Sequence, residues 1–150
     1  MLDVAFMIEI LPRVLRAALV TLQLSFLSLF FSVILGLIFS TLALSSGKLT
    51  NILIRCFVEF TRGVPQLVQI SIIYFALPYI GIYFDEFWTG VVALSFIGAG
   101  YTIEIFRNAV LNIEKGQHEA GKILGLNNFQ ILTYVLYPQI IKRSLPPITN

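Results

Sequence analysis

The stretch AALVTLQLSFLSLFFSVILGLIFSTLAL, residues 17–44, contains no charged side chain. About 20 apolar residues in a helix are enough to cross the hydrocarbon core of a bilayer. The whole chain has the same character, because 57% of its residues are hydrophobic and only 12% are charged. Soluble domains carry about 25% charged residues. The sequence therefore predicts a membrane protein.

Two further uncharged runs follow, residues 63–84 and residues 87–103, and the second can continue to about Asn112. Helices are expected, because backbone groups in lipid must pair within the segment, and the alternation of a membrane strand is absent. We predict an all-α, multi-span helical bundle in one domain, residues 1–150. Its expected parts are spans at about 17–44, 63–84 and 87–112, a cytoplasmic segment at about 113–138, and the start of a fourth span to 150.

The distribution of lysine and arginine predicts the orientation of the spans, because cytoplasmic segments carry an excess of both. With the N-terminus outside, the outer segments hold two basic residues, Arg13 and Arg16. The inner segments then hold eight: Lys48, Arg55, Arg62, Arg107, Lys115, Lys122, Lys142 and Arg143. We therefore expect a multi-pass protein of the cell (inner or plasma) membrane, with its N-terminus outside and the 113–138 segment in the cytoplasm.

The two ends of the chain carry separate expectations. The first residues are acidic and the first apolar run is too long for the core of a signal peptide, so no secretory signal is expected. The chain closes with SLPPITN, residues 144–150, where a fourth span is expected to leave the cytoplasm. This pattern indicates either a fragment or a truncated copy of a longer protein.

Small and hydroxyl-bearing residues recur in the first span at spacings of three and four, which places them on one helix face: Thr21, Ser25, Ser28, Ser32 and Gly36. Small residues let helices approach each other closely in lipid. We interpret this face as a helix-packing face, in preference to a face that lines a solute path.

A charged and polar pattern leads into the second run: Arg55, Glu59, Arg62, Gln66 and Gln69. These residues would form one stripe on a continuous helix, although Gly63 and Pro65 interrupt it. One interpretation is a solvated face whose ion pairs contribute little. The other is a gate near the cytoplasmic mouth, with Gln66 and Gln69 facing a water-filled path.

Polar residues of the third span fall within about a third of the helix circumference: Gly98, Tyr101, Glu104, Asn108 and Asn112. Glu104 lies inside the apolar stretch, where a carboxylate is costly and usually faces a cavity or a partner. It can pair with Arg107, contact a solute, or contact another subunit, and these three interpretations stay open. Tyr101 and Glu104 are therefore candidate residues of a solute path.

The polar segment EAGKILGLNNFQILTYVLYP, residues 119–138, predicts a helical hairpin outside the membrane. Gly125 suits the position just after a first helix at about 117–124. Asn127 can cap a second helix together with the glutamine three residues on, and this helix is expected to end at Pro138. Such a hairpin either docks a partner or lies on the lipid surface.

Several kinds of catalytic and ligand site are not expected. GQHEAGKI, residues 116–123, nearly matches a phosphate-binding loop, but Ile123 replaces the hydroxyl that would hold Mg²⁺, and a membrane helix precedes it instead of a strand. His118 lacks a second ligand at metal spacing, and the single cysteine, Cys56, excludes an internal disulfide. We expect no catalytic residue, no metal site, no cofactor and no nucleic-acid partner.

The hairpin resembles the EAA motif of permeases in ATP-binding-cassette (ABC) importers, a pattern of E-A-A, a later glycine, and a final Ile-x-Leu-Pro. The matching residues are Glu119, Ala120, Gly125 and Pro138, with Val135 in the place of isoleucine. Gly121 stands where the family has its second alanine, and Tyr137 where it has leucine.

Other stretches resemble the polar amino acid branch of the same family: TLQLS at 21–25, EFTRGVPQLVQ at 59–69, YTIEIFRNAV at 101–110 and YPQIIKRSLPPITN at 137–150. The third span departs from that branch. The family often carries Asn-Ser-Gly-Ala-Tyr where this chain has Ile-Gly-Ala-Gly-Tyr, ending at Tyr101.

The resemblance implies the transmembrane domain of a type I ABC importer, which would move a polar amino acid across the lipid bilayer. The whole domain of that family contains more spans than the sequence of this chain. The implied partners are a second permease chain (identical or a sister), two ABC ATPase subunits and an extracytoplasmic solute-binding protein. ATP hydrolysis would take place in the separate ATPase, so the chain itself is not expected to be an enzyme.

The resemblance also implies roles for particular residues. The helix that couples to the ATPase would contain Glu119, Ala120, Gly121 and Gly125. The candidate residues of the substrate path, Gln66, Gln69, Tyr101 and Glu104, come instead from the spacing described above. Gly121 is expected to cost the coupling helix about 1 kcal/mol relative to alanine, and so to weaken coupling.

Two other functions are compatible with the same pattern. A passive channel or pore-forming oligomer would also contain polar-striped spans, without any ATPase. An inactive, truncated permease remnant would only assemble with a sister subunit.

Overall fold

The computed structural model describes residues 4–45 and 47–149, and every regular element within these ranges is helical. The elements are α1 (Val4–Ser45), α2 (Lys48–Gly63), α3 (Gln66–Ala76), the 3₁₀-helix η1 (Leu77–Ile80), α4 (Glu86–Leu111), α5 (Lys115–Ile123), α6 (Asn128–Gln130), the π-helix η2 (Ile131–Leu136) and α7 (Tyr137–Thr149). The predicted all-α fold is confirmed for the described residues.

Two of these helices are long and apolar enough to cross a membrane, Phe6–Ala43 within α1 and Glu86–Leu111, which is α4. They correspond to the first and third predicted spans, although α1 begins at Val4 rather than at residue 17. The start of α4 is fixed by Asp85, whose side chain accepts a hydrogen bond from the backbone N–H of Trp88 at 2.7 Å. The predicted fourth span begins with α7, and Asn150 lies outside the described residues.

The second apolar run, residues 63–84, does not form one straight span. The helix breaks between Gly63 and Gln66, and α2 and the α3–η1 pair meet at 109°. Pro65 has no N–H and pushes Val64 into an extended conformation, with ψ at 135°. The pair counts as one span only if it crosses as a broken helix. The interruption expected at Gly63 and Pro65 is confirmed, so Arg55 and Gln69 do not share one continuous helix.

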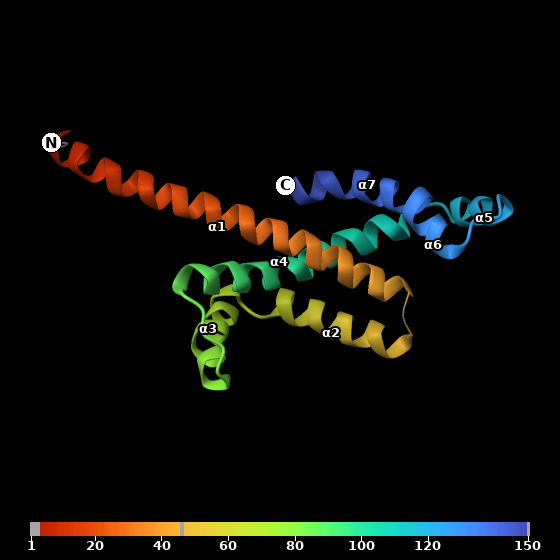
Figure 1. Ribbon diagram of the computed structural model, residues 1–150, viewed down its shortest axis with the longest axis horizontal. Helices are drawn as coiled ribbons and strands as arrows, with labels where there is room; N and C mark the ends of the chain where they lie inside the picture. Colours follow the sequence, from red (N-terminus) through yellow and green to blue (C-terminus); the bar gives the residue numbers. More distant parts are fainter. Residues whose placement is uncertain (1–3, 46, 150) are drawn as a thin grey trace.

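Figure 1 shows how the helices are arranged along the molecule. Helix α1 crosses α4, α2 lies beside α4, and α3 points away from both. The end of α1 and the start of α2 lie toward the same end as α5, whereas the start of α1 and the start of α4 lie toward the other end. The hairpin and the start of α2, both predicted to be cytoplasmic, thus lie toward one end of the structure, while orientation in a membrane stays a prediction.

Helices α1 and α4 meet through small residues on both sides. A Cβ added to Gly98 would lie 2.8 Å from the Cβ of Ser32, and one added to Gly36 would collide with the side chain of Thr102. The Thr102 hydroxyl donates a hydrogen bond to the carbonyl oxygen of Ser32 at 2.8 Å. The helix-packing interpretation is therefore confirmed for Ser28, Ser32 and Gly36, which are buried.

The same face of α1 is not packed along its whole length. Thr21 and Ser25, which belong to the predicted stripe, are exposed. Ser40, one turn beyond Gly36, is buried and extends the packed region toward α2. The contact between α1 and α4 therefore lies in the second half of α1.

The other helices join this pair through α4. The side chain of Thr61 on α2 occupies the space in which a Cβ on Gly100 would have to lie. On another part of α4, Phe106 and Ala109 form a buried apolar cluster with Ile140 of α7. Helix α4 thus contacts α1, α2, α3 and α7, and is the central helix of the described chain.

Gly36→Ala is expected to lower the stability of the full-length protein. The added methyl group must push α1 away from Thr102, which costs about 1–3 kcal/mol, more than the roughly 1 kcal/mol that alanine gains in helix propensity. Thermal unfolding in mild detergent measures the change. Gly63→Ala is the matched control, because nothing lies within 4 Å of a Cβ there, and it should unfold at or above the wild-type temperature.

Candidate functional site

The first helix of the predicted hairpin ends as expected. Gly125 adopts φ of 78°, the left-handed conformation that glycine accepts at no steric cost. The N–H of Leu126 donates to the carbonyl of Gly121 at 3.1 Å, and the N–H of Gly125 to that of Lys122 at 3.0 Å. These two bonds form a Schellman motif, which satisfies the last carbonyl groups of α5 and fixes the direction of the chain after it.

The second helix begins with the predicted capping box. The backbone N–H of Gln130 donates to the side chain of Asn127, and the backbone N–H of Asn127 to the side chain of Gln130, both at 2.9 Å. This reciprocal pair satisfies two amide groups that have no partner within the helix. The turn between the two helices is therefore defined on both sides by local hydrogen bonds.

The expectation that the second helix ends at Pro138 is wrong. The chain continues through η2 and α7 to Thr149, and Pro138 is the second residue of α7. The widened π-turn ends with the N–H of Tyr137 donating to the carbonyl of Leu132, five residues earlier. Proline is tolerated in the first turn of a new helical segment, so the change from π-helix to α-helix accommodates Pro138.

Close packing explains why position 121 is a glycine, which the sequence did not show. A Cβ at this position would lie 2.8 Å from Cγ1 of Ile131, which is fully buried. The absence of a side chain lets α5 lie directly on η2. The expected cost of glycine relative to alanine applies to an isolated helix, and here alanine itself would not fit without a shift of one helix.

Long-range hydrogen bonds attach the start of α7 to the two membrane helices. The hydroxyl of Tyr137 is hydrogen-bonded to that of Thr41 on α1. The guanidinium of Arg143 donates to the carbonyl oxygen of Asn112, at the end of α4. The hairpin is therefore tied to both α1 and α4 beyond its covalent connection to α4.

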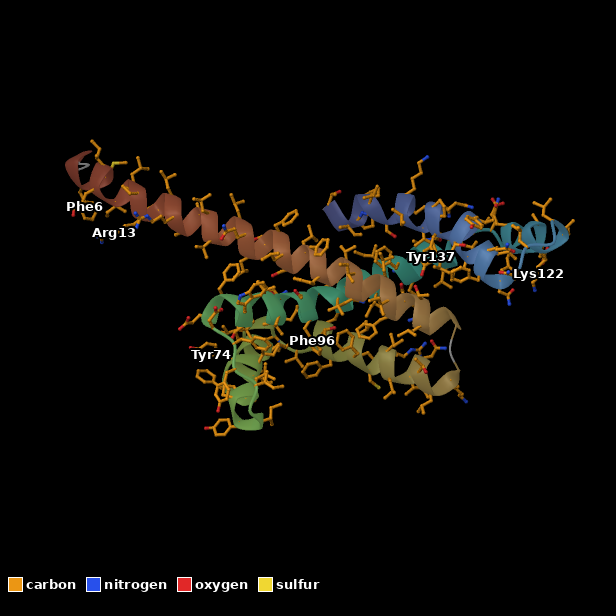
Figure 2. All side chains as sticks on the ribbon, viewed as in Figure 1. Phe6, Arg13, Tyr74, Phe96, Lys122 and Tyr137 are labelled. Atoms are coloured by element: carbon orange, nitrogen blue, oxygen red, sulfur yellow. The ribbon has the colours of Figure 1, made fainter. Side chains whose placement is uncertain are left out.

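The outer surface of the hairpin carries the remaining EAA residues. Glu119 and Ala120 are exposed on α5, where GQHEAGKI forms a helix rather than a phosphate-binding loop. Figure 2 shows Lys122 at the end of the molecule and Tyr137 closer to α1 and α4. Large apolar side chains are exposed on the same hairpin: Ile123, Leu124, Phe129 and Tyr134, each more than 70% accessible.

The two candidate glutamines of α3 have different surroundings. Gln66 is exposed, whereas Gln69 is 2% exposed. The Gln69 amide nitrogen donates to the carbonyl oxygens of Thr61 at 3.0 Å and Val64 at 2.7 Å. Gln69 thus holds the end of α2 against the start of α3, while its own Oε1 is buried without a hydrogen-bond partner. A role of either glutamine in a solute path stays a prediction.

The candidate residues of α4 lie near basic side chains. Glu104 and Arg107 approach to 3.9 Å, so the local pairing considered for Glu104 is present in the structure. One turn earlier, the ring of Tyr101 faces the guanidinium of Arg62, with 5.8 Å between Cζ and the ring centroid. Among residues 4–45 and 47–149, no ion pair within 4.0 Å involves Glu59, so the spacing on α2 does not produce the pairs it permits.

Gly121→Ala is expected to loosen the hairpin although it restores the residue of the EAA pattern. Overpacking against Ile131 costs about 1–3 kcal/mol, which exceeds the helix-propensity gain of about 1 kcal/mol. Hydrogen exchange of the full-length protein should show faster exchange across 117–136. The control is Gly116→Ala on the same helix, where nothing lies within 4 Å of a Cβ. Amide exchange across 117–136 that is equally slow in the Gly121→Ala and Gly116→Ala proteins would contradict the packing argument.

Comparison with known proteins places this chain among transport proteins. Residues 32–150 match the family described as binding-protein-dependent transport system inner membrane component. The chain is 38% identical over 143 residues to the probable amino-acid ABC transporter permease protein YckA of Bacillus subtilis (strain 168), covering 95% of this chain and 63% of that protein. It is 37% identical over 142 residues to the glutamine transport system permease protein GlnP of Escherichia coli (strain K12), covering 93% and 65%.

A solved structure agrees with the sequence comparisons. The crystal structure of an amino acid ABC transporter with histidines matches with a TM-score of 0.84 and 32% identity, over 99% of this chain and 69% of that one. The chain spans somewhat less than two thirds of the length of YckA and of GlnP. Because the family model matches from Ser32 onward through most of its residues, the chain belongs to the family of binding-protein-dependent transport system inner membrane components.

Proposed function

We propose that the full-length protein is the permease subunit of an ATP-driven importer that carries a polar amino acid across the cell membrane. The observation that carries the proposal is the hairpin, whose EAA residues Glu119 and Ala120 are exposed on α5, and whose turn is fixed by hydrogen bonds at Gly125 and Asn127. The relatives named for amino acids and for glutamine support the substrate class. The chain itself moves the solute, and a separate subunit hydrolyses ATP.

The partners follow from this role. Two ABC ATPase subunits bind on the cytoplasmic side, a second permease chain completes the path, and a solute-binding protein delivers the amino acid from outside. The exposed apolar side chains beside Glu119, such as Ile123 and Leu124, supply a surface for the ATPase. The N-terminus lies outside and the hairpin inside, as the excess of lysine and arginine predicts.

The mechanism is alternating access. Closure of the ATPase dimer on ATP displaces α5, and η2 and α7 follow because α5 packs on Ile131 through Gly121. The ties from Tyr137 to Thr41 and from Arg143 to the end of α4 pass that displacement to both membrane helices. The spans then tilt to face outside, and release of ADP reverses the change.

Glu119→Lys in the full-length protein is expected to abolish capture of the ATPase while membrane insertion stays normal. The change reverses the charge of an exposed residue in the middle of α5, where a basic group of the partner would favour a carboxylate. Co-purification in mild detergent measures the effect. Glu114→Lys, an exposed change just before α5, is the matched control and should retain the ATPase.

Two results would contradict the proposal. Normal co-purification of the ATPase with the Glu119→Lys protein would contradict the proposal that the hairpin binds the ATPase. Solute uptake into proteoliposomes that persists without ATP would instead favour a passive channel.

A further inference from the structure

An arginine side chain lies at the break between α2 and α3, facing the middle of α4. Arg62 is the basic residue in the last turn of α2, and its guanidinium lies over the ring of Tyr101. With a rise of about 1.5 Å per residue, Tyr101 is about 22 Å from the Glu86 end of α4 and about 15 Å from the Leu111 end. In a bilayer that α4 crosses, this position falls inside the hydrocarbon core of about 30 Å, so Arg62 lies deeper than the cytoplasmic segment in which the sequence placed it.

The guanidinium of Arg62 does not bind the terminal carbonyl groups of its own helix. A basic residue in a last turn often serves the terminal carbonyl groups. Here the carbonyl of Phe60 accepts from the backbone N–H of Val64, and that of Thr61 accepts from the Gln69 amide. Within residues 4–45 and 47–149, Arg62 forms no ion pair within 4.0 Å, and its recorded contact is the ring of Tyr101.

The surroundings of Arg62 suit an anionic group. Helix α3, of 11 residues, begins four positions after Arg62, and the first amide groups of a helix have no partner within it. The positive end of its dipole adds to the field of the guanidinium. The Oε1 of Gln69, at the same break, is buried and has no hydrogen-bond partner among the described residues.

We propose that Arg62, supported by Tyr101, binds the α-carboxylate of the transported amino acid at the break between α2 and α3. An arginine in the core of a membrane is costly, so it needs an anionic partner. Guanidinium binds carboxylate through two parallel hydrogen bonds, and transporters commonly place substrate sites where membrane helices are interrupted. The inference rests on the proposed function, and it adds a residue and a chemical group to the predicted path.

The experiment uses the full-length permease–ATPase complex in nanodiscs, without the solute-binding protein. The probe is radiolabelled L-glutamine, or whichever of the twenty amino acids the wild-type complex binds more tightly, and the competitor is its α-carboxamide. The carboxamide should bind the wild type roughly 10- to 100-fold more weakly than the amino acid, as expected for loss of hydrogen bonds to a charged group. Arg62→Gln should weaken amino acid binding to the level of the carboxamide, and Arg62→Lys should fall between.

The matched control is Arg55→Gln, an exposed change two turns earlier on α2, which should bind the amino acid like the wild type. Unchanged preference for the amino acid over its carboxamide in the Arg62→Gln complex would overturn the inference and leave the proposed function intact. Equal binding of the amino acid and its carboxamide by the wild type would also overturn the inference and leave the proposed function intact. A wild-type complex that binds no amino acid would overturn the inference, and one that also drives no ATP-dependent amino acid uptake together with its solute-binding protein would overturn both.

Discussion

The close crossing of α1 and α4 is the contact on which the rest of the structure depends. At Gly36 and Gly98 the facing helix is too close to leave room for a side chain. The Thr102 hydroxyl donates a hydrogen bond to the backbone of α1. In lipid, such contacts replace the hydrophobic driving force that water supplies to soluble proteins. Once α4 is fixed against α1, its other sides are free to receive α2 at Gly100 and α7 at the cluster around Phe106.

The hairpin is held to this pair of helices by side-chain contacts as well as by the chain connection. Its turn is set by local hydrogen bonds at Gly125 and Asn127, and its two helices are pressed together where Gly121 meets Ile131. The tie from Tyr137 to Thr41 then connects the same unit to α1. A displacement applied at α5 therefore reaches both membrane helices through contacts that are close and directional, which is what a coupling element requires.

Features set by local chemistry could be predicted from the sequence, and features set by distant contacts could not. Hydropathy identified α1 and α4, and the turn residues Gly125 and Asn127 act on their immediate neighbours. Pro65 predicted an interruption, but not the 109° angle between α2 and the α3–η1 pair, both of whose α-helices also contact α4. The fit of Gly121 against Ile131 and the passage of the helix through Pro138 depend on residues brought together only by folding.

Coupling to an ATPase requires α5 to face the cytoplasm, because an ATPase can reach it only from that side of the membrane. In a full-length protein whose native cysteines, including Cys56, are replaced by serine, Lys122→Cys places a single thiol on α5, and Tyr83→Cys places one just before α4. Both positions are exposed. An impermeant maleimide applied to spheroplasts should label the Tyr83→Cys protein and should label the Lys122→Cys protein only after permeabilisation. Labelling of the Lys122→Cys protein in intact spheroplasts would contradict the account.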